Sequence, residues 1–358
     1  MNTTPRPLMQ LQCPMPKMDF DIITLGHGSG GILTHKLLEA GVFDLLSNPL
    51  LDTHHDGAIL NLTGRVAFTT DSYVISPPFF PGGNIGELAV NGTVNDLAMC
   101  GAMPQYLSLS FILEEGLTMV EFWDVLVSIK GASERAGVQI VTGDTKVVDR
   151  GKGDKIFINM SGIGELHPRA DISAKNVRAG DKVIVSGHIA THGMAIMSVR
   201  EGLEFETTLT SDTAPLNHTV RALLDVFGPD IHLLRDPTRG GVATVLNEIA
   251  RDRSTGATRV GIDLNQGAIP VLDEVAGACE LLGLDPLYVA NEGVFLAIVA
   301  PGIADAFVET LRTLDYASSA AIIGEIVAGH PGQVVLTSRI GGRRVVNMLI
   351  GEQLPRIC

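Results

Sequence analysis

Short apolar runs alternate with longer stretches of helical spacing along most of the chain. Runs of β-branched and other apolar residues that end at polar or glycine positions are typical of strands. The clearest of these runs are residues 66–69, 139–141, 156–160, 182–186 and 294–299. Apolar residues three and four positions apart predict helices, at 32–38, 88–99, 122–129 and 242–249. Because both halves show this alternation, the sequence predicts an α/β fold.

The length of the chain predicts two domains. At roughly 150 residues per domain, 358 residues are enough for two. The segment 167–171, followed by Gly180 and Asp181, is the best boundary. We therefore expect a first domain over residues 19–170 and a second over residues 171–345. Residues 1–18, with four prolines, are expected to form a flexible arm.

Composition and charge exclude several classes of protein. A net charge of −14 disfavours nucleic acid, which is bound by clustered lysine and arginine. No apolar run approaches the roughly 20 residues needed to span a bilayer, and residues 1–18 lack the apolar block of a signal peptide. These features predict a cytoplasmic protein that contacts neither nucleic acid nor membrane.

The cysteines and histidines show no metal-ligand spacing. The four cysteines (Cys13, Cys100, Cys279 and Cys358) form no CxxC pair, which argues against a disulfide framework or structural zinc. Cys100 and Cys279 stand among apolar residues, so we expect both in the core. The histidines, His192 included, are not spaced as metal ligands with carboxylates.

A glycine-rich segment, GHGSGG at residues 26–31, stands directly before a predicted helix. Glycines allow backbone N–H groups to approach an anion, and the helix N-terminus adds favourable partial charge. The segment is therefore a credible phosphate loop, with contacts expected from Gly28, Ser29, Gly30 and Gly31. It is not a Walker A motif, because no lysine follows the glycines. A flexible connection between arm and domain would look the same.

Four aspartates are predicted beside strand ends or glycine turns: Asp71, Asp96, Asp144 and Asp236. Carboxylates in such positions suit a hard divalent cation, and Mg²⁺ held there would neutralise nucleotide phosphates. Any one of them can equally be a helix cap or a turn residue.

Lys146 and Glu292 also stand next to glycine-containing segments. Near a nucleotide they would supply charge stabilisation and a proton acceptor. Either can equally be a surface residue in a turn.

The chain ends in Pro-Arg-Ile-Cys, residues 355–358. A cysteine with nothing after it is a thiol on a tether, which can be carried to its reaction partner. It is not a prenylation signal, because Pro355 stands where that signal places its cysteine. Gly351 and Pro355 suit a hinged, extended segment, so we expect residues 346–358 to form a mobile tail. An accidental exposed thiol is the alternative.

Together these segments resemble the HypE family of hydrogenase maturation factors, within the superfamily of aminoimidazole ribonucleotide synthetase and selenophosphate synthetase. The match runs in order from about Leu25 to Cys358. The segments that carry it are 26–31, 68–72, 79–86, 143–148, 236–241, 291–293 and 355–358. The resemblance implies an α/β first domain whose strands form a β-barrel across a homodimer. It also implies a second α/β domain, with ATP in the cleft between the two.

The resemblance also implies an activity. Members of this family receive a carbamoyl group on the terminal thiol from a HypF-like carbamoyltransferase. They then use ATP to dehydrate the thiocarboxamide to a thiocyanate. The cyanide passes to iron on a HypC–HypD-like scaffold during assembly of the [NiFe]-hydrogenase centre.

Roles for single residues follow from matching positions in the family. Cys358 would carry the substrate, Lys146 would stabilise developing charge and Glu292 would accept protons. Mg²⁺ would be bound by Asp71, Asp96, Asp144 and Asp236, and ATP would also contact Asn95, Thr145, Arg239 and Gly240.

Two alternatives remain at this stage. The first is a selenophosphate synthetase-like enzyme, because Cys13 and Lys17 faintly resemble its reactive pair. The residues between them are not glycine-rich, and that activity leaves Cys358 unexplained. The second is a non-catalytic thiol carrier, for which an intact ATP site would be superfluous.

Overall fold

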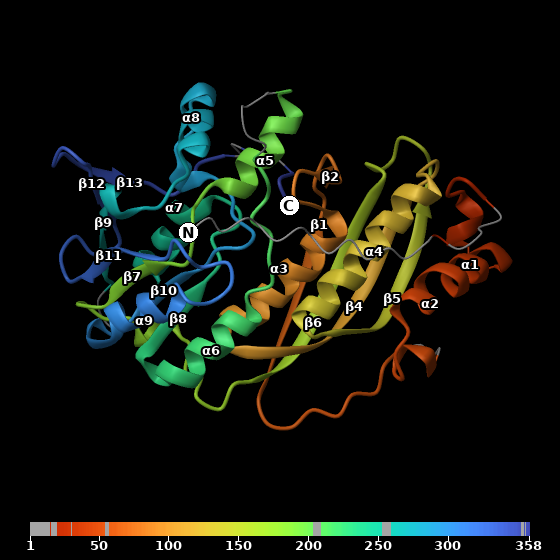
Figure 1. The fold of residues 1–358 in the computed structure, drawn as a ribbon, viewed down its shortest axis with the longest axis horizontal. Coiled ribbons are helices and arrows are strands. Elements are labelled where there is room, and N and C mark those ends of the chain that lie inside the picture. Colours follow the sequence, from red (N-terminus) through yellow and green to blue (C-terminus); the bar gives the residue numbers. More distant parts are fainter. Residues whose placement is uncertain are drawn as a thin grey trace.

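The chain folds around two β-sheets that lie side by side, as Figure 1 shows. The computed structural model describes residues 15, 20–29, 31–53, 57–202, 209–252, 259–351, 354 and 356–358. A four-stranded sheet belongs to the N-terminal half and a seven-stranded sheet to the C-terminal half, with helices packed on both. The predicted α/β class is therefore confirmed.

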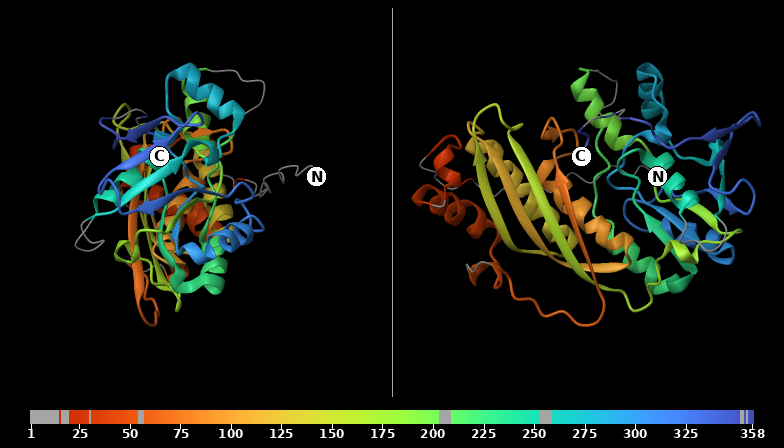
Figure 2. Two further views of the ribbon diagram at one scale, coloured as in Figure 1. Left: turned by 90° about the vertical axis from the view of Figure 1, so that its left-hand side faces the viewer. Right: turned by 180° about the vertical axis from the view of Figure 1, so that it is seen from behind.

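The N-terminal sheet has the strand order β1-β6-β4-β5. Its strands are β1 (Val66–Tyr73), β4 (Ala102–Glu114), β5 (Gln139–Val148) and β6 (Ile156–Leu166). Only β4 and β5 are parallel. Helices α3 (Ile85–Met99) and α4 (Met119–Ala136) cover one face, whereas no helix of the described residues covers the other, which faces the viewer on the right of Figure 2.

Local sequence signals determine where these two helices begin and end. Asn84 caps α3 by accepting hydrogen bonds from the backbone N–H groups of Gly86 and Glu87. A capping box between Thr118 and Glu121 starts α4, and Gly137 ends it in a left-handed conformation with φ of 70°. Glycine adopts that conformation without the steric cost of a Cβ atom.

The C-terminal sheet has the order β13-β12-β9-β11-β7-β10-β8. Its strands are β7 (Lys182–Val185), β8 (Ile231–Arg235), β9 (Gly261–Asn265), β10 (Leu296–Val299), β11 (Ala321–Val327), β12 (Val334–Thr337) and β13 (Arg343–Val346). Helix α7 (Gly241–Arg251) packs on one face, while α6 (Asn217–Phe227) and α9 (Ala304–Leu311) pack on the other. Helices α5 (Thr191–Arg200) and α8 (Asp273–Leu282) share a smaller apolar cluster.

The remaining elements are short. Around the glycine loop and after it lie η1 (Leu25–Gly28), α1 (Ile32–Leu37), the π-helix η2 (Leu38–Phe43), α2 (Asp44–Leu46) and η3 (Leu51–Thr53). A small hairpin is formed by β2 (Phe79–Phe80) and β3 (Gly83–Asn84). Further single turns are η4 (Ala174–Asn176), η5 (Gly228–Asp230), η7 (Gln266–Ala268), η8 (Pro286–Tyr288) and η9 (Pro301–Ile303).

Each predicted strand and helix overlaps an observed one, but three aspartates are not at element ends. Asp71 lies inside β1, Asp96 inside α3 and Asp144 inside β5. Cys100 is also not a core residue, because it caps the C-terminus of α3 and is exposed. Cys279 is buried, as expected.

Among the described residues, none of the helices is long and apolar enough to cross a membrane. The C-terminus lies between the two halves of the molecule, near α5 and β1 (Figure 1). The tail therefore reaches a position that both sheets border.

Candidate functional site

A polar cavity of about 170 Å³ lies between the two sheets. Its walls bring together many of the predicted site residues from both halves. They are Thr70, Asp71, Gly92, Asp96, Asp236, Thr238, Arg239, Glu292 and Cys358. The terminal cysteine is therefore placed among predicted metal and nucleotide ligands, even though it is distant from them in sequence.

Strand alternation directs Asp71 toward this cavity. Successive side chains of a strand point to opposite faces, so Thr69, Asp71 and Tyr73 all face helix α3. There Thr69 Oγ1 donates a hydrogen bond of 2.8 Å to Asp96 Oδ2. A side chain at Gly92 would collide with Tyr73, so glycine allows the close approach of α3 to β1.

Asp96 and Asp236 share an environment that disfavours their charge. Burial raises the pKa of Asp96, and the charge of Asp71 raises it further. Burial, followed by the charge of Asp96, raises the pKa of Asp236 to about 7. Because each unit of raised pKa disfavours the ionised carboxyl by about 1.4 kcal/mol, a cation bound here would stabilise the ionised form of these carboxyls.

The carboxylates of this cavity suit the predicted Mg²⁺, provided that other ligands complete its coordination. Carboxylate oxygens are its preferred protein ligands, and Asp71, Asp96 and Asp236 line one cavity. In the described part of the chain, no three acidic, cysteine or histidine side chains are placed to hold a metal ion by themselves. A cation here would therefore need other ligands, such as phosphate oxygens, to complete its coordination.

Glu292 is buried, with an exposed fraction of 4%, and its backbone is held from both sides. Its N–H donates to Asp212 Oδ1 at 3.2 Å, and its carbonyl accepts from Asn95 Nδ2 at 3.2 Å. Any side chain at Gly293 would collide with the carbonyl of Asp212. Glycine at position 293 is thus required for the close packing that positions Glu292.

The carboxyl group of Glu292 has a strong affinity for a proton. Burial, and then the charge of Asp212, raises the pKa of Glu292 well above its usual value. Within the described residues, Glu292 Oε1 has no hydrogen-bond partner. A buried carboxyl with a raised pKa and a free oxygen is suited to proton transfer.

Asn95, predicted as a nucleotide contact, uses its amide to join the two halves of the chain. Besides its bond to the Glu292 carbonyl, its Nδ2 donates to the carbonyl of Ala214 at 3.0 Å, and its Oδ1 accepts from the N–H of Leu216 at 2.8 Å. The side chain is therefore occupied by backbone groups of the second half. Sequence alone did not indicate this role.

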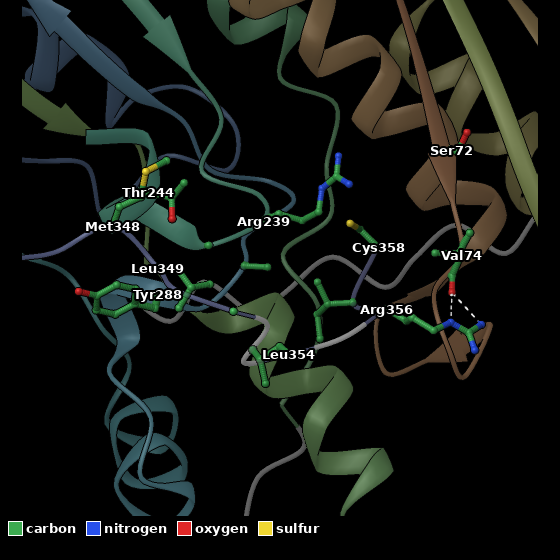
Figure 3. A pocket seen from close by; sticks show the side chains of 14 residues that line it. Ser72, Val74, Arg239, Thr244, Tyr288, Met348, Leu349, Leu354, Arg356 and Cys358 are labelled. Atoms are coloured by element: carbon green, nitrogen blue, oxygen red, sulfur yellow. Dashed lines mark hydrogen bonds between the residues drawn. The ribbon is translucent and has the colours of Figure 1, made fainter. Parts of the chain in front are cut away.

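Cys358 has a thiol that stays neutral in its observed position. Burial, and then the charge of Glu292, raises the pKa of Cys358 to about 12. A second cavity, of about 340 Å³, shares Cys358 and Arg239 with the first. Figure 3 shows the sulfur of Cys358 turned toward Arg239, with Leu354 and Arg356 of the tail nearby.

The remaining predicted residues lie at the opposite edge of the N-terminal sheet. A cavity of about 170 Å³ there is lined by Gly28, Asp144, Thr145 and Lys146, together with apolar side chains such as Phe43 and Phe111. Lys146 Nζ lies 2.8 Å from Asp144 Oδ1, and this hydrogen bond lowers the pKa of Asp144. Since β1 and β5 are opposite edge strands, one chain does not bring Lys146 to the Cys358 cavity.

The glycine loop packs against β5, beside the cavity lined by Asp144 and Lys146. A side chain at Gly28 would lie 2.5 Å from the backbone nitrogen of Val147, so glycine allows the loop to lie on the strand. Ser29 Oγ donates to the carbonyl of Gly26 at 2.9 Å, and Gly31 precedes α1 as its N-cap. Gly30 lies outside the described residues. Gly240 has φ of 74° directly before α7, next to Arg239.

Comparisons with known proteins cover almost the whole chain. Residues 54–166 match the family model of the AIR synthase related protein, N-terminal domain, and residues 178–337 match its C-terminal domain. A protein from Rhizobium leguminosarum bv. viciae named carbamoyl dehydratase HypE is 49% identical over 337 residues, which are 94% of this chain and 95% of that protein.

Solved structures give the same result. A crystal structure of hydrogenase maturation protein HypE in complex with ATP superposes with a TM-score of 0.89 at 47% identity, covering 93% of this chain and 99% of that one. A HypE–HypF complex contains a chain with a TM-score of 0.76 at 43% identity, covering 89% and 100%. The fold, the position of the terminal cysteine and these matches together show that the chain belongs to the HypE family.

Proposed function

We propose that this protein dehydrates a carbamoyl group carried on Cys358, using ATP, and so converts a thiocarboxamide into a thiocyanate. The observation that supports this most directly is that Cys358, Glu292 and three of the four aspartates line one cavity. A group attached to the sulfur would lie beside a cation site and a proton acceptor. The cyanide made in this way would become a ligand of the iron in a [NiFe]-hydrogenase.

The reaction proceeds in two steps. The amide oxygen is a poor leaving group, so the γ-phosphoryl group of ATP is first transferred to it, which yields ADP and a phosphorylated imidate after loss of one N–H proton. In the second step the remaining N–H proton is removed as phosphate leaves, and a carbon–nitrogen triple bond forms. Holding the carbamoyl oxygen near the phosphoryl group accelerates the first step by proximity.

The chain's own residues supply the proton acceptor and the charge stabilisation. Glu292 lines the cavity beside the thiol, and its raised pKa makes it a strong base once it is ionised. It accepts one N–H proton in the first step and releases it to solvent before accepting the second. Arg239 borders the same cavity and offsets negative charge as phosphate departs. Both roles require the tail to occupy the position seen in this structure.

ATP would bring its own negative charge to an acidic cavity, so a cation is needed. Asp71, Asp96 and Asp236 would hold Mg²⁺, which would neutralise phosphate charge and orient the triphosphate. The glycine loop, Thr145 and Lys146 would bind other parts of the nucleotide in the cavity beside β5. The related HypE structure that contains ATP supports nucleotide binding by this fold.

A second copy of the chain would unite the two sites. The bare face of the N-terminal sheet exposes apolar side chains, among them Phe68 at 69% and Ile112 at 46%. Its edge strands β1 and β5 each pair with only one strand among the described residues. If β1 of one copy met β5 of another, the two sheets would close into a barrel. Lys146 of one copy would then approach Cys358 of the other.

This arrangement predicts a homodimer in which Lys146 and Cys358 act across the interface. Light scattering should give the mass of two chains without any partner. Chains with Lys146→Ala and chains with Cys358→Ala should each be inactive alone. When mixed, they should regain about a quarter of the normal rate, because half of randomly formed dimers contain one complete site of two. A monomer at micromolar concentration, or mixed variants that stay inactive, would contradict the arrangement.

Carbamoylation requires the tail to leave this position. The nucleophile of a thiol is its thiolate, and a pKa of about 12 keeps Cys358 protonated in the cavity. The thiol therefore reacts with its carbamoyl donor outside and returns once it carries the neutral group. A HypF-like carbamoyltransferase is the proposed donor, consistent with the solved HypE–HypF complex, and a HypC–HypD-like scaffold is the proposed acceptor of cyanide.

The experiment that tests this function is the mass of the C-terminal peptide after incubation with the carbamoyl donor and ATP. The mass should first increase by one carbamoyl group and then decrease by one water. Without ATP, only the first change is expected. Carbamoylation that is never followed by loss of water would exclude the dehydratase activity and favour the thiol carrier.

A further inference from the structure

His192 contacts the docked tail but has no part in the chemistry proposed above. It lies in the first turn of α5, is fully buried, and has both ring nitrogens engaged. Nε2 lies 2.8 Å from the carbonyl oxygen of Ile357, and Nδ1 lies 2.7 Å from Ser211 Oγ. The ring also meets Phe80 edge-on, with 5.6 Å between the ring centroids.

These partners determine which nitrogen carries the proton. Burial lowers the pKa of His192 to about 4, so the ring is neutral near pH 7 and has one N–H. The carbonyl of Ile357 can only accept, so Nε2 is the donor and Nδ1 accepts from the hydroxyl of Ser211. Ser211 Oγ in turn accepts from the N–H of Thr213 at 3.1 Å. The ring is thus fixed as a hydrogen-bond donor to the tail.

The first half of the chain holds the neighbouring peptide groups of the tail. The carbonyl of Cys358 accepts from the N–H of Val74 at 3.1 Å, and that of Arg356 accepts from Ser76 at 3.3 Å. The guanidinium of Arg356 donates to the carbonyl of Val74, as the dashed lines in Figure 3 show. The carbonyl of Ile357, between them, is held by His192 of the second half.

The docked conformation depends on such contacts. Arg356 has φ of 54°, a left-handed conformation that costs free energy for any residue with a Cβ atom. Arg200, near the end of α5, also donates to the carbonyl of Arg356. Helix α5 therefore contributes two side chains that hold the tail in place.

His192 is also linked to Glu292. Asp212, next to Ser211, accepts hydrogen bonds from the backbone N–H groups of His192, Glu292 and Gly293. The position of the tail and the position of the proposed proton acceptor therefore share one anchor. A shift of His192 would move the sulfur of Cys358 relative to Glu292.

We propose that His192 is a positioning residue that latches the tail in the cavity by donating its Nε2–H to the carbonyl of Ile357. The inference rests on the proposed function only in giving the latched state a purpose, which is to hold the carbamoyl group beside Glu292. The latch itself is a property of the protein without substrate. It can be measured without any turnover.

Two substitutions separate the hydrogen bond from the packing of the ring. In His192→Gln, the side-chain amide nitrogen can take the place of Nε2 and still donate to Ile357. In His192→Asn, the shorter amide can replace Nδ1 but does not reach the tail. Because both variants lose the aromatic ring, any difference between them reports the donor to Ile357.

The readout is the rate at which iodoacetamide alkylates Cys358 in the full-length protein, followed by peptide mass. Cys100, which is exposed, serves as the reference thiol in the same chain. The docked thiol is protonated, so alkylation proceeds through the undocked state and its rate reports the population of that state. We expect about tenfold faster alkylation of Cys358 in His192→Asn, the effect of one buried hydrogen bond, and a rate near wild type in His192→Gln.

Ser211→Ala provides a milder variant in case the asparagine variant does not fold. Without its hydroxyl, Nδ1 of the ring can carry the proton, so alkylation of Cys358 should accelerate by a smaller factor. Equal rates in wild type, His192→Asn and Ser211→Ala would overturn the proposal. Equal acceleration in the Asn and Gln variants would also overturn it, because it would assign the effect to the ring's packing.

A second measurement separates this inference from the proposed function. If the protein dehydrates the carbamoyl group, His192→Asn should slow the loss of water, whereas carbamoylation, which also uses the undocked thiol, should be no slower than in wild type. If the wild-type peptide never loses water, the proposed function fails, while the alkylation rates still decide whether His192 is a latch.

Discussion

Replacing Cys358 with alanine is expected to abolish thiocyanate formation completely while leaving the fold and ATP binding nearly unchanged. The thiol is the attachment point of the substrate in the proposed reaction, so no other group in the cavity substitutes for it. The residue is the last of the chain and only partly buried. Loss of its sulfur should therefore change the free energy of unfolding by about 1 kcal/mol or less.

The measurement is the mass of the C-terminal peptide, together with calorimetric titration of ATP in the presence of Mg²⁺. Cys100→Ala is the matched control, because Cys100 is a free thiol of the same chain at the end of α3. It should behave as wild type in both assays. Thiocyanate production by the Cys358→Ala protein would refute the assignment of the carrier thiol.

The sequence predicted the elements better than their ends. Residues 139–141 were predicted as a strand, but β5 continues to Val148. The prediction stopped at Gly143 and Asp144 because glycine and aspartate are typical of turns. In the sheet this edge strand has one bare face, so polar side chains such as Asp144 and Lys146 are tolerated there.

Cys100 was misplaced for a related reason. Its apolar neighbours Ala98 and Met99 are buried, and a pattern of apolar residues suggests that the next residue is buried too. The helix ends at this position, however, and the chain turns through Gly101 with φ of 75°. Burial at a helix terminus depends on what packs beyond the end, which the local pattern does not contain.

The sequence indicated which residue types form the site, but it did not indicate which of these residues share a cavity. The terminal cysteine and the acidic residues beside glycines were recognisable from sequence, and the cavity contains Asp71, Asp96 and Asp236. Asp144 lies with Lys146 at the other edge of the sheet because of the order of the strands. The local sequence of a strand does not determine which strand lies beside it. The roles of His192 and Asn95 depend on backbone groups more than one hundred residues away.

Glu292→Gln is expected to slow the loss of water by about 10²- to 10⁴-fold, the usual contribution of a positioned proton acceptor. Gln keeps the shape of the side chain but does not accept a proton. Carbamoylation, which occurs on the undocked thiol, should continue, so the C-terminal peptide should accumulate with the carbamoyl mass. Glu325→Gln, at a surface position in β11 paired with Lys182, is the matched control and should leave both steps unchanged.

The pH dependence provides a second, independent test of this prediction. The pKa of Glu292 is raised in the fold chiefly by burial, so the wild-type rate should increase as the pH rises through that pKa and ionises the acceptor. A carboxyl with a raised folded pKa favours the fold while protonated, and this contribution is lost as the pH rises through the folded value. Glutamine carries no such charge, so the variant should be at least as stable as wild type at alkaline pH while being almost inactive. A variant that loses activity together with thermal stability would instead identify Glu292 as a residue needed for folding, and one that dehydrates at the wild-type rate would remove it from the reaction.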